Sequence, residues 1–198
     1  MTKKIILLNA PPGAGKDFAA NYLANNINNC KLDKFARVLK ERTHALYGFP
    51  NRSWNYYEDC KDVSNKDFLK LTPRQAYINV SEQYFKPIHG KRVFGELLLQ
   101  DLQKCSEEII AISDSGFLEE AEVLIEKYGE DNVLLIQIHR DGYTFKGDSR
   151  DYILLDQCKS HWVINEGDKT FATTILDLVL DWLDNLEEEE DPEDLYFG

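Results

Sequence analysis

A lysine that follows two closely spaced glycines is the feature of this chain with the clearest chemistry. Gly13, Gly15 and Lys16 come after the apolar run 5–8 and before a segment that is compatible with a helix. Glycines let consecutive backbone N–H groups turn toward an oxyanion, while a helix N-terminus and one ammonium group supply positive potential. The spacing predicts a phosphate-binding loop that holds ATP through Pro12, Gly13, Ala14, Gly15, Lys16, Asp17 and Phe18. The alternative is a glycine-rich strand-to-helix turn without a ligand.

This loop differs from the usual G-x-x-x-x-G-K-[ST] pattern at two positions. Ala10 stands where the first glycine is expected, and Asp17 stands where a hydroxyl group normally reaches Mg²⁺. A carboxylate beside phosphates must be offset by a metal ion or an arginine. We therefore expect Asp17 to hold Mg²⁺, directly or through water, although it could also act only as a favourable charge at a helix N-terminus.

Lys16 is the first candidate for a catalytic residue. Its ammonium group would bridge the β- and γ-phosphates of ATP and neutralise the charge shared between the donor and the transferred group. Asp114 is the second carboxylate of interest, because it ends the apolar run 109–113. In this position it would bind Mg²⁺, directly or through water, or contact the acceptor. The alternative is a cap for the helix expected from Leu118.

The segment 140–153 has the composition of a closing lid, with glycines, alternating charges and the arginines Arg140 and Arg150. Phosphoryl transfer needs cations around the migrating group and exclusion of water. Guanidinium groups bind phosphate oxygens in pairs and stay charged, so both arginines are predicted to be catalytic. The alternative is an exposed loop whose basic residues only balance its acidic ones.

The elements that would position these residues alternate between strands and helices. Four near-continuous apolar runs predict strands buried on both faces of a parallel sheet: 4–9, 109–113, 133–139 and 161–165. A weaker pattern at 30–35 predicts a fifth strand. Helical patterns cover 17–25, 36–47, 73–85, 95–106, 118–128 and 170–186. This alternation predicts an α/β fold, a doubly wound three-layer αβα arrangement with a parallel sheet of about five strands and its site at the carboxyl edge.

Residues 1–186 are expected to form a single domain, with a helical acceptor-binding insertion at about 36–106. Basic residues gather in this insertion, around an expected break at Pro87 and Gly90. The candidates for acceptor binding are Arg37, Lys40, Arg74, Glu82 and Lys86, together with Asp114. Residues 187–198 begin with a like-charge acidic block and are predicted to be a solvated tail.

Net charge and composition limit the kinds of partner that the chain can bind. The 198 residues carry a net charge of −12, which argues against a nucleic acid polymer or an anionic membrane as the main partner. No apolar stretch approaches the length of a membrane span, and the four scattered cysteines have no metal-binding or disulfide spacing. We therefore expect a cytoplasmic protein.

Taken together, these motifs resemble the bacteriophage deoxynucleoside monophosphate kinase family, and the resemblance implies a three-layer αβα P-loop kinase fold. The ordered matches are residues 13–17, 35–40, 72–76, 81–82, 85–87, 113–117, 119–121 and the lid. The resemblance implies Mg²⁺-dependent transfer of the γ-phosphoryl group of ATP to a deoxynucleoside monophosphate, in the host cytoplasm if the chain is phage-encoded, and a homodimer. The chain departs from the family at Ser115, where an arginine is often found, and at Phe18, where a hydroxyl group is expected. A kinase for another small phosphate, such as phosphomevalonate, and an ATP-binding regulator without kinase activity are the alternatives.

Overall fold

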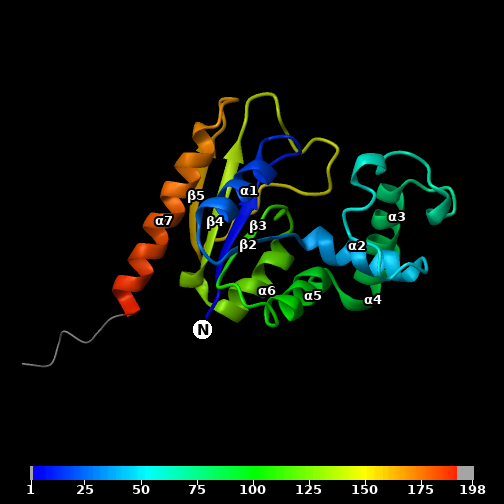
Figure 1. Cartoon of the computed structure of the whole chain (residues 1–198), viewed down its shortest axis with the longest axis horizontal. Coiled ribbons are helices and arrows are strands. Elements are labelled where there is room, and N and C mark those ends of the chain that lie inside the picture. Colours follow the sequence, from blue (N-terminus) through cyan, green and yellow to red (C-terminus); the bar gives the residue numbers. More distant parts are fainter. Residues whose placement is uncertain (1, 191–198) are drawn as a thin grey trace, which may run out of the picture.

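Five parallel strands form one sheet in the order β2-β3-β1-β4-β5 (Figure 1). The computed structural model describes residues 2–190, with side chains to residue 186. The strands are β1 (Lys4–Asn9), β2 (Cys30–Asp33), β3 (Ile109–Ile112), β4 (Val133–His139) and β5 (Lys159–Ile164). The predicted five-stranded parallel sheet is therefore confirmed.

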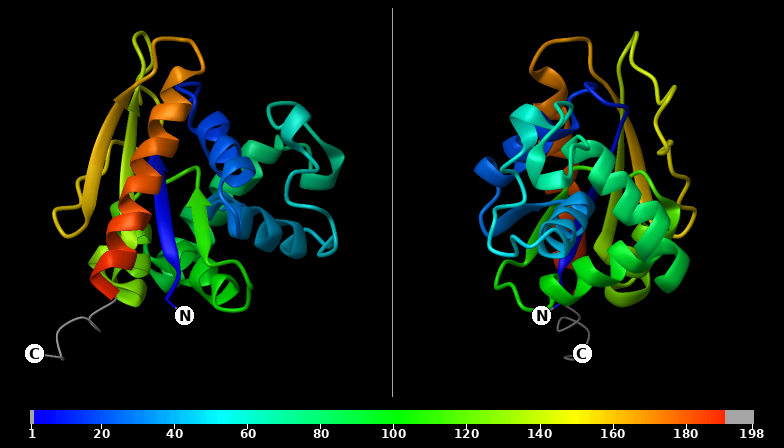
Figure 2. Two further views of the ribbon diagram at one scale, coloured as in Figure 1. Left: turned by 60° about the vertical axis from the view of Figure 1, so that its left-hand side comes forward. Right: turned by 90° about the vertical axis from the view of Figure 1, so that its right-hand side faces the viewer.

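Helices cover both faces of this sheet, which makes three layers (Figure 2). The α-helices of the described residues are α1 (Lys16–Asn26), α2 (Phe35–Leu46), α3 (Pro73–Val80), α4 (Lys86–His89), α5 (Val93–Leu102), α6 (Leu118–Tyr128) and α7 (Thr170–Glu190). Helices α1 and α7 pack on one face, while α5 and α6 pack on the other. The predicted three-layer arrangement is confirmed.

Strand β1 explains why a continuous apolar run forms the centre of the sheet. Alternate side chains of a strand point to opposite faces. Ile6 and Leu8 join the core under α1 and α7, whereas Ile5 and Leu7 join the core under α5 and α6. All four side chains are fully buried, so every position in the run is apolar.

The outer part of the insertion between β2 and β3, which includes α3, lies away from the sheet beyond α2 (Figure 1). It has its own aromatic core, in which the rings of Tyr57, Phe68 and Tyr77 surround His44. Burial lowers the pKa of His44. Its ring nitrogens lie 3.0 Å from the Tyr77 hydroxyl and 3.2 Å from the Arg52 carbonyl. This small core holds the outer part of the insertion together.

The helical path through the insertion differs from our expectation at one point. The chain stays helical past Val80 through a π-helical turn, Ser81–Phe85, and then through α4. Pro87 lies in the first turn of α4, directly after the π-helical turn, so its missing N–H removes one backbone donor from this helical path without ending it. The break therefore falls at Gly90 alone, which has a φ of 86°.

The last helix also continues beyond its expected end. Helix α7 continues to Glu190 and so includes the first four residues of the segment that we interpreted as an acidic tail. The remainder of the predicted tail, residues 191–198, lies outside the described residues.

The contact between α5 and α6 gives a stability prediction. A Cβ atom on Gly95 would lie 2.7 Å from the carbonyl oxygen and 3.0 Å from the Cα atom of Glu120. Backbone atoms cannot move aside cheaply, so this overlap outweighs the gain in helix propensity of about 1 kcal/mol. We expect Gly95→Ala to lower the free energy of unfolding by about 1–3 kcal/mol, measured by urea denaturation.

Gln100→Ala is the matched control, because Gln100 lies on the exposed side of the same helix. Its free energy of unfolding should stay within about 0.5 kcal/mol of the parent. A Gly95→Ala protein as stable as the parent would contradict the tight packing of α5 on α6.

Candidate active site

The loop between β1 and α1 has the conformation that the glycines were expected to provide. Gly13 and Gly15 have φ values of 78° and 105°, in the left-handed region that favours glycine. Gly15 is the residue before α1, which begins at Lys16. The loop thus presents a helix N-terminus at the carboxyl edge of the sheet, where an anion is favoured.

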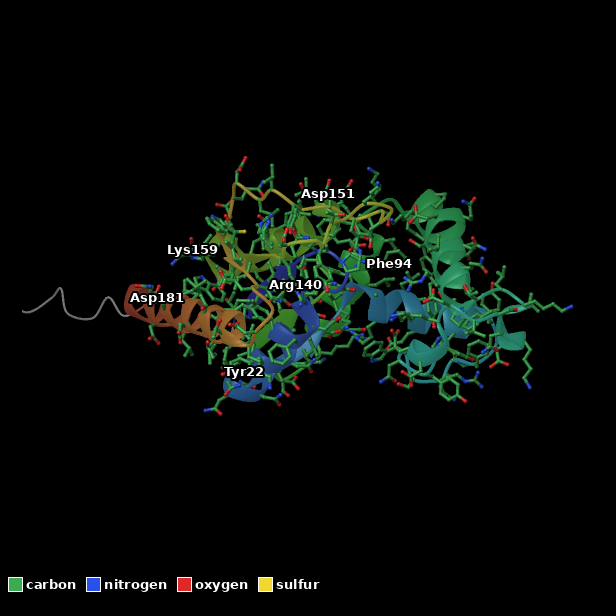
Figure 3. All side chains as sticks on the ribbon, turned by 90° about the horizontal axis from the view of Figure 1, so that it is seen from above. Tyr22, Phe94, Arg140, Asp151, Lys159 and Asp181 are labelled. Carbon is green, nitrogen blue, oxygen red and sulfur yellow. The ribbon has the colours of Figure 1, made fainter. Side chains whose placement is uncertain are left out.

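Two residues outside the loop hold its shape. The buried Asn165, just after β5, donates from Nδ2 to the carbonyl oxygen of Ala14 at 2.9 Å. Arg140, just after β4, donates to the carbonyl oxygen of Gly13 at 3.2 Å. In Figure 3, Arg140 lies over the dark blue ribbon of this loop. Sequence reasoning missed Asn165, although a polar residue that ends an apolar strand was the available signal.

Lys16 is 8% exposed, and its Nζ atom lies 3.4 Å from the carbonyl oxygen of Pro11. Burial lowers the pKa of Lys16, and the positive charge of Arg150 lowers it further. Asp17 and Asp114 act in the opposite direction. An anion bound beside the Lys16 ammonium group would therefore offset both its loss of solvation and its repulsion by Arg150.

Asp17 lies at the start of α1 between two donors. Its Oδ1 atom accepts from Lys34 at 2.6 Å and from Ser113 at 2.9 Å. Burial would raise the pKa of Asp17, but these hydrogen bonds and the charge of Lys34 lower it overall. Mg²⁺ prefers one or two carboxylates together with phosphate oxygens. Hydrogen bonds fix Oδ1 of Asp17, and its side chain is 59% exposed. Asp17 therefore fits a Mg²⁺ site that is shared with phosphate oxygens.

Asp114 caps a helix that we did not expect it to reach. Its two carboxylate oxygens accept from the backbone N–H groups of Phe35 and Ala36, both at 2.8 Å, at the start of α2. Burial raises the pKa of Asp114, while these hydrogen bonds oppose the rise. The alternative of a cap for the helix at Leu118 is wrong, because α6 has no side-chain cap. Asp114 instead ties the end of β3 to the insertion.

The lid arginine Arg150 lies among the charges of the phosphate loop. It donates from Nε and Nη2 to the two oxygens of Asp148, at 2.9 and 2.6 Å. This ion pair raises the pKa of Arg150, and the negative charges of Asp114 and Asp17 contribute to the rise. The charge of Arg150 in turn lowers the pKa of Lys16, so the two groups are within electrostatic reach of each other. Their binding of phosphate stays a prediction.

Arg74 lies at the start of α3, in the insertion. Its Nε and Nη2 atoms donate to Asp62 at 2.6 and 3.2 Å. This ion pair raises the pKa of Arg74, whereas the positive charge of Arg150 opposes the rise. The two guanidinium groups are therefore within electrostatic reach of each other, each with its own carboxylate.

Two other acceptor candidates on α2 are held by several acidic groups. Arg37 forms ion pairs with Asp33, Glu41 and Asp101 at 2.6, 3.0 and 3.2 Å. It lines a cavity of about 540 Å³ at the β2 edge, to which neither Lys16 nor Arg150 contributes. Lys40 pairs with Glu58 and lies 5.1 Å from the ring centre of Trp54. These contacts connect α2 with its neighbours.

Lys86 and Glu82 form an ion pair of 2.7 Å at the end of the π-helical turn. The Lys86 ammonium group also lies 4.3 Å from the ring centre of Phe117, in the loop that follows β3. Sequence reasoning missed Glu120, which is 3% exposed in the first turn of α6. Burial raises the pKa of Glu120 to about 8, Asp114 contributes to the rise, and Lys86 and Arg150 oppose it.

Other predicted features have simpler outcomes within the part of the chain that the structure describes. No helix there has the length and apolarity to cross a bilayer. No group of three or more His, Cys, Asp or Glu side chains in residues 2–186 is arranged to hold a metal ion. The four cysteines are unpaired.

By sequence, the chain matches no protein-family model and none of the curated proteins. By structure, it is similar to a gluconokinase from Sinorhizobium meliloti, with 10% identity, 95% of each chain covered and a TM-score of 0.50. A thymidylate kinase from Candida albicans overlaps with 14% identity, 91% of this chain and 92% of the other, and a TM-score of 0.46. The match to the gluconokinase, together with the five-stranded parallel sheet, shows the three-layer αβα fold of P-loop kinases that the sequence predicted. The resemblance to the bacteriophage family stays a prediction.

The raised pKa of Glu120 gives a pH prediction. Between its ordinary value of 4.5 and about 8, the folded protein keeps a proton that the unfolded chain has lost. Stability linked to Glu120 therefore falls as pH rises through this window. Glu120→Gln removes that linkage, so the variant should gain stability relative to the parent between about pH 5 and about pH 8, by up to about 1.4 kcal/mol per pH unit.

Urea denaturation at several pH values measures this difference. Glu119→Gln is the control. Glu119 is next to Glu120 in the sequence, but the hydrogen bond from Lys91 lowers the pKa of Glu119. The control should show no such gain toward high pH. Parallel stability curves for the parent and Glu120→Gln would contradict the burial of an ionisable carboxyl group.

Proposed function

We propose that this protein transfers the γ-phosphoryl group of Mg-ATP to a deoxynucleoside monophosphate, giving ADP and a deoxynucleoside diphosphate. The observation that carries the proposal is the conformation of the loop after β1, where Gly13 and Gly15 have positive φ values and Lys16 begins α1. The charge of Arg150 lowers the pKa of Lys16, which supports a role for both cations on one phosphate. Arg74, in the insertion, is the candidate for the second phosphate.

The proposed reaction needs positioning and charge neutralisation from the protein. Lys16 would contact the β- and γ-phosphates, because it follows the glycine loop at the N-terminus of α1. Arg150 would bind the transferred group, and Arg140, which lies over Gly13, would cover the triphosphate. A phosphate monoester is already ionised at neutral pH, so the acceptor needs no general base.

Asp17 and, through water, Asp114 would hold Mg²⁺ in this scheme. When bound, Mg²⁺ would neutralise charge on the phosphates. Of the two carboxylates, Asp17 has the freer oxygen, since both oxygens of Asp114 accept from α2. Asp114 would thus act mainly on the orientation of α2, the helix that leads to the insertion.

The acceptor class rests on the resemblance of the sequence motifs, and the position of Arg74 supports it. Arg74 would bind the acceptor phosphate opposite Arg150. Lys86 and Glu82 would contact the acceptor beside Phe117, and Arg37 and Lys40 would contribute from α2. The same resemblance implies a homodimer, which light scattering would test directly.

A substrate panel tests the proposed function. Release of ADP from Mg-ATP would be followed with dAMP, dGMP, dTMP, dCMP, the ribonucleotides and phosphomevalonate. We expect turnover that depends on one or more deoxynucleoside monophosphates and on Mg²⁺. Turnover with phosphomevalonate alone, or with no acceptor at all, would contradict the proposed acceptor.

Alanine variants test the two principal cations. We expect Lys16→Ala and Arg150→Ala each to lower kcat by about 10³-fold, because each removes charge that stabilises the transferred phosphoryl group. Lys127→Ala is the control, since Lys127 is exposed on α6. Steady-state kinetics and thermal unfolding of all three variants provide the comparison. Unchanged kcat in both cation variants, with folding intact, would refute their assignment.

A further inference from the structure

The Arg150 side chain packs directly on Gly116 and occupies the space that a side chain at position 116 would need. A Cβ atom on Gly116 would lie 2.7 Å from Cβ and 2.8 Å from both Cγ and Cδ of Arg150. Real Cβ atoms do not approach other atoms this closely. The φ of Gly116 is outside the left-handed region, so its backbone would accept alanine. The three atoms nearest to such a Cβ atom all belong to the side chain of Arg150.

The segment that carries Arg150 is also fixed to the core by one buried amide. Asn9, at the end of β1, is fully buried. Its Nδ2 atom donates to the carbonyl oxygens of Ser115 and Asp151, at 2.6 and 3.0 Å. Its Oδ1 atom accepts from the backbone N–H of Ile153 at 3.0 Å. One side chain therefore joins the phosphate-loop strand, the loop after β3 and the returning part of the lid.

The Arg150 guanidinium group is held at one edge and open at the other. Asp148 engages Nε and Nη2, and it also accepts from the Arg150 backbone N–H at 3.0 Å. Nη1 makes no hydrogen bond to any residue that the structure describes. The remaining donor edge is thus available to a phosphate oxygen near Lys16.

Within the described residues, segment 141–147 makes no side-chain hydrogen bond to the core; its contact there is the Tyr143 ring, which packs so closely on Gly13 that a Cβ atom on Gly13 would lie 2.7 Å from Cε1 of Tyr143. Residues 141–144, 146 and 147 are exposed. The backbone hydrogen bonds there are local, from Tyr143 to Arg140 and from Asp148 to Phe145. By contrast, Asp151, which Figure 3 labels on the yellow lid segment, is bonded to the core through Asn9 and Gly116. The lid therefore has an exposed arm, 141–147, and an anchored limb, 148–153.

We propose that Gly116 and Asn9 are positioning residues that hold Arg150 on the anchored limb of the lid, facing the phosphate site before any ligand arrives. This inference rests on the proposed function, because it assumes that Arg150 binds the transferred phosphoryl group. Only the exposed arm then has to move for a nucleotide to enter. The arginine keeps its place, which lowers the cost of ordering it during the reaction.

A double-mutant cycle tests the link between Gly116 and Arg150. We expect Gly116→Ala to lower kcat by about 100-fold, because a displacement of about 1 Å is enough for such a loss, with little change in KM for ATP. In the Arg150→Ala background the same substitution should change kcat by less than about twofold, because the guanidinium group that it displaces is gone, even though the contact with Cβ of residue 150 remains. Ser149→Thr, which adds a methyl group at the exposed neighbour, is the control and should leave kcat within about twofold. Equal losses from Gly116→Ala in both backgrounds would overturn the proposal.

Limited trypsin digestion tests the anchored limb without relying on activity. Cleavage after Lys146, on the exposed arm, should precede cleavage after Arg150, on the anchored limb, as followed by mass spectrometry. In Gly116→Ala, cleavage after Arg150 should accelerate by about tenfold or more, because the anchored limb can no longer pack on residue 116. Cleavage after Arg150 at the parent rate would overturn the proposal. Failure of the substrate panel with this protease pattern intact would instead locate the error in the proposed function.

Discussion

Cations that are to meet a phosphate must be held close together before the phosphate is present. Like charges repel at short range, and the repulsion grows where water is excluded. Each cation at this site therefore has a carboxylate close by: Asp17 and Asp114 near Lys16, Asp148 on Arg150 and Asp62 on Arg74. A chain of net charge −12 can assemble a basic site in this way, because its acidic residues neutralise the cations locally without occupying the centre.

The parallel sheet supplies the rigid frame for these pairs. Its strand ends bring together the glycine loop after β1, Ser113 and Asp114 after β3, Arg140 after β4 and Asn165 after β5. Asp114 then carries this order outward, because it caps α2 and so couples the loop after β3 to the insertion. Asn9 does the same for the lid. Phosphate loop, insertion and lid are thus all tied to neighbouring strands of one sheet.

The sequence was informative wherever one local pattern determines the outcome. Continuous apolar runs such as Ile5–Leu8 predicted strands buried on both faces, and the glycine spacing before Lys16 predicted the loop conformation. Contacts between distant segments were beyond such reasoning. Arg74 finds Asp62, twelve residues away, and Asp114 reaches Ala36, 78 residues away. Nothing in the neighbouring residues indicates these partners, because they depend on how the insertion folds back. Glu120 was missed for the same reason, since only the packed structure shows that its carboxyl group is buried.

Following the γ-phosphorus atom of ATP by ³¹P NMR tests the central claim most directly. With Mg-ATP and the deoxynucleoside monophosphate that the protein accepts, the account predicts that the γ-phosphate signal is replaced by the β-phosphate signal of a deoxynucleoside diphosphate, together with the signals of ADP. In Arg150→Ala this signal should grow far more slowly. The appearance of inorganic phosphate alone would contradict the account, because the converging cations would then serve hydrolysis rather than transfer to a second phosphate.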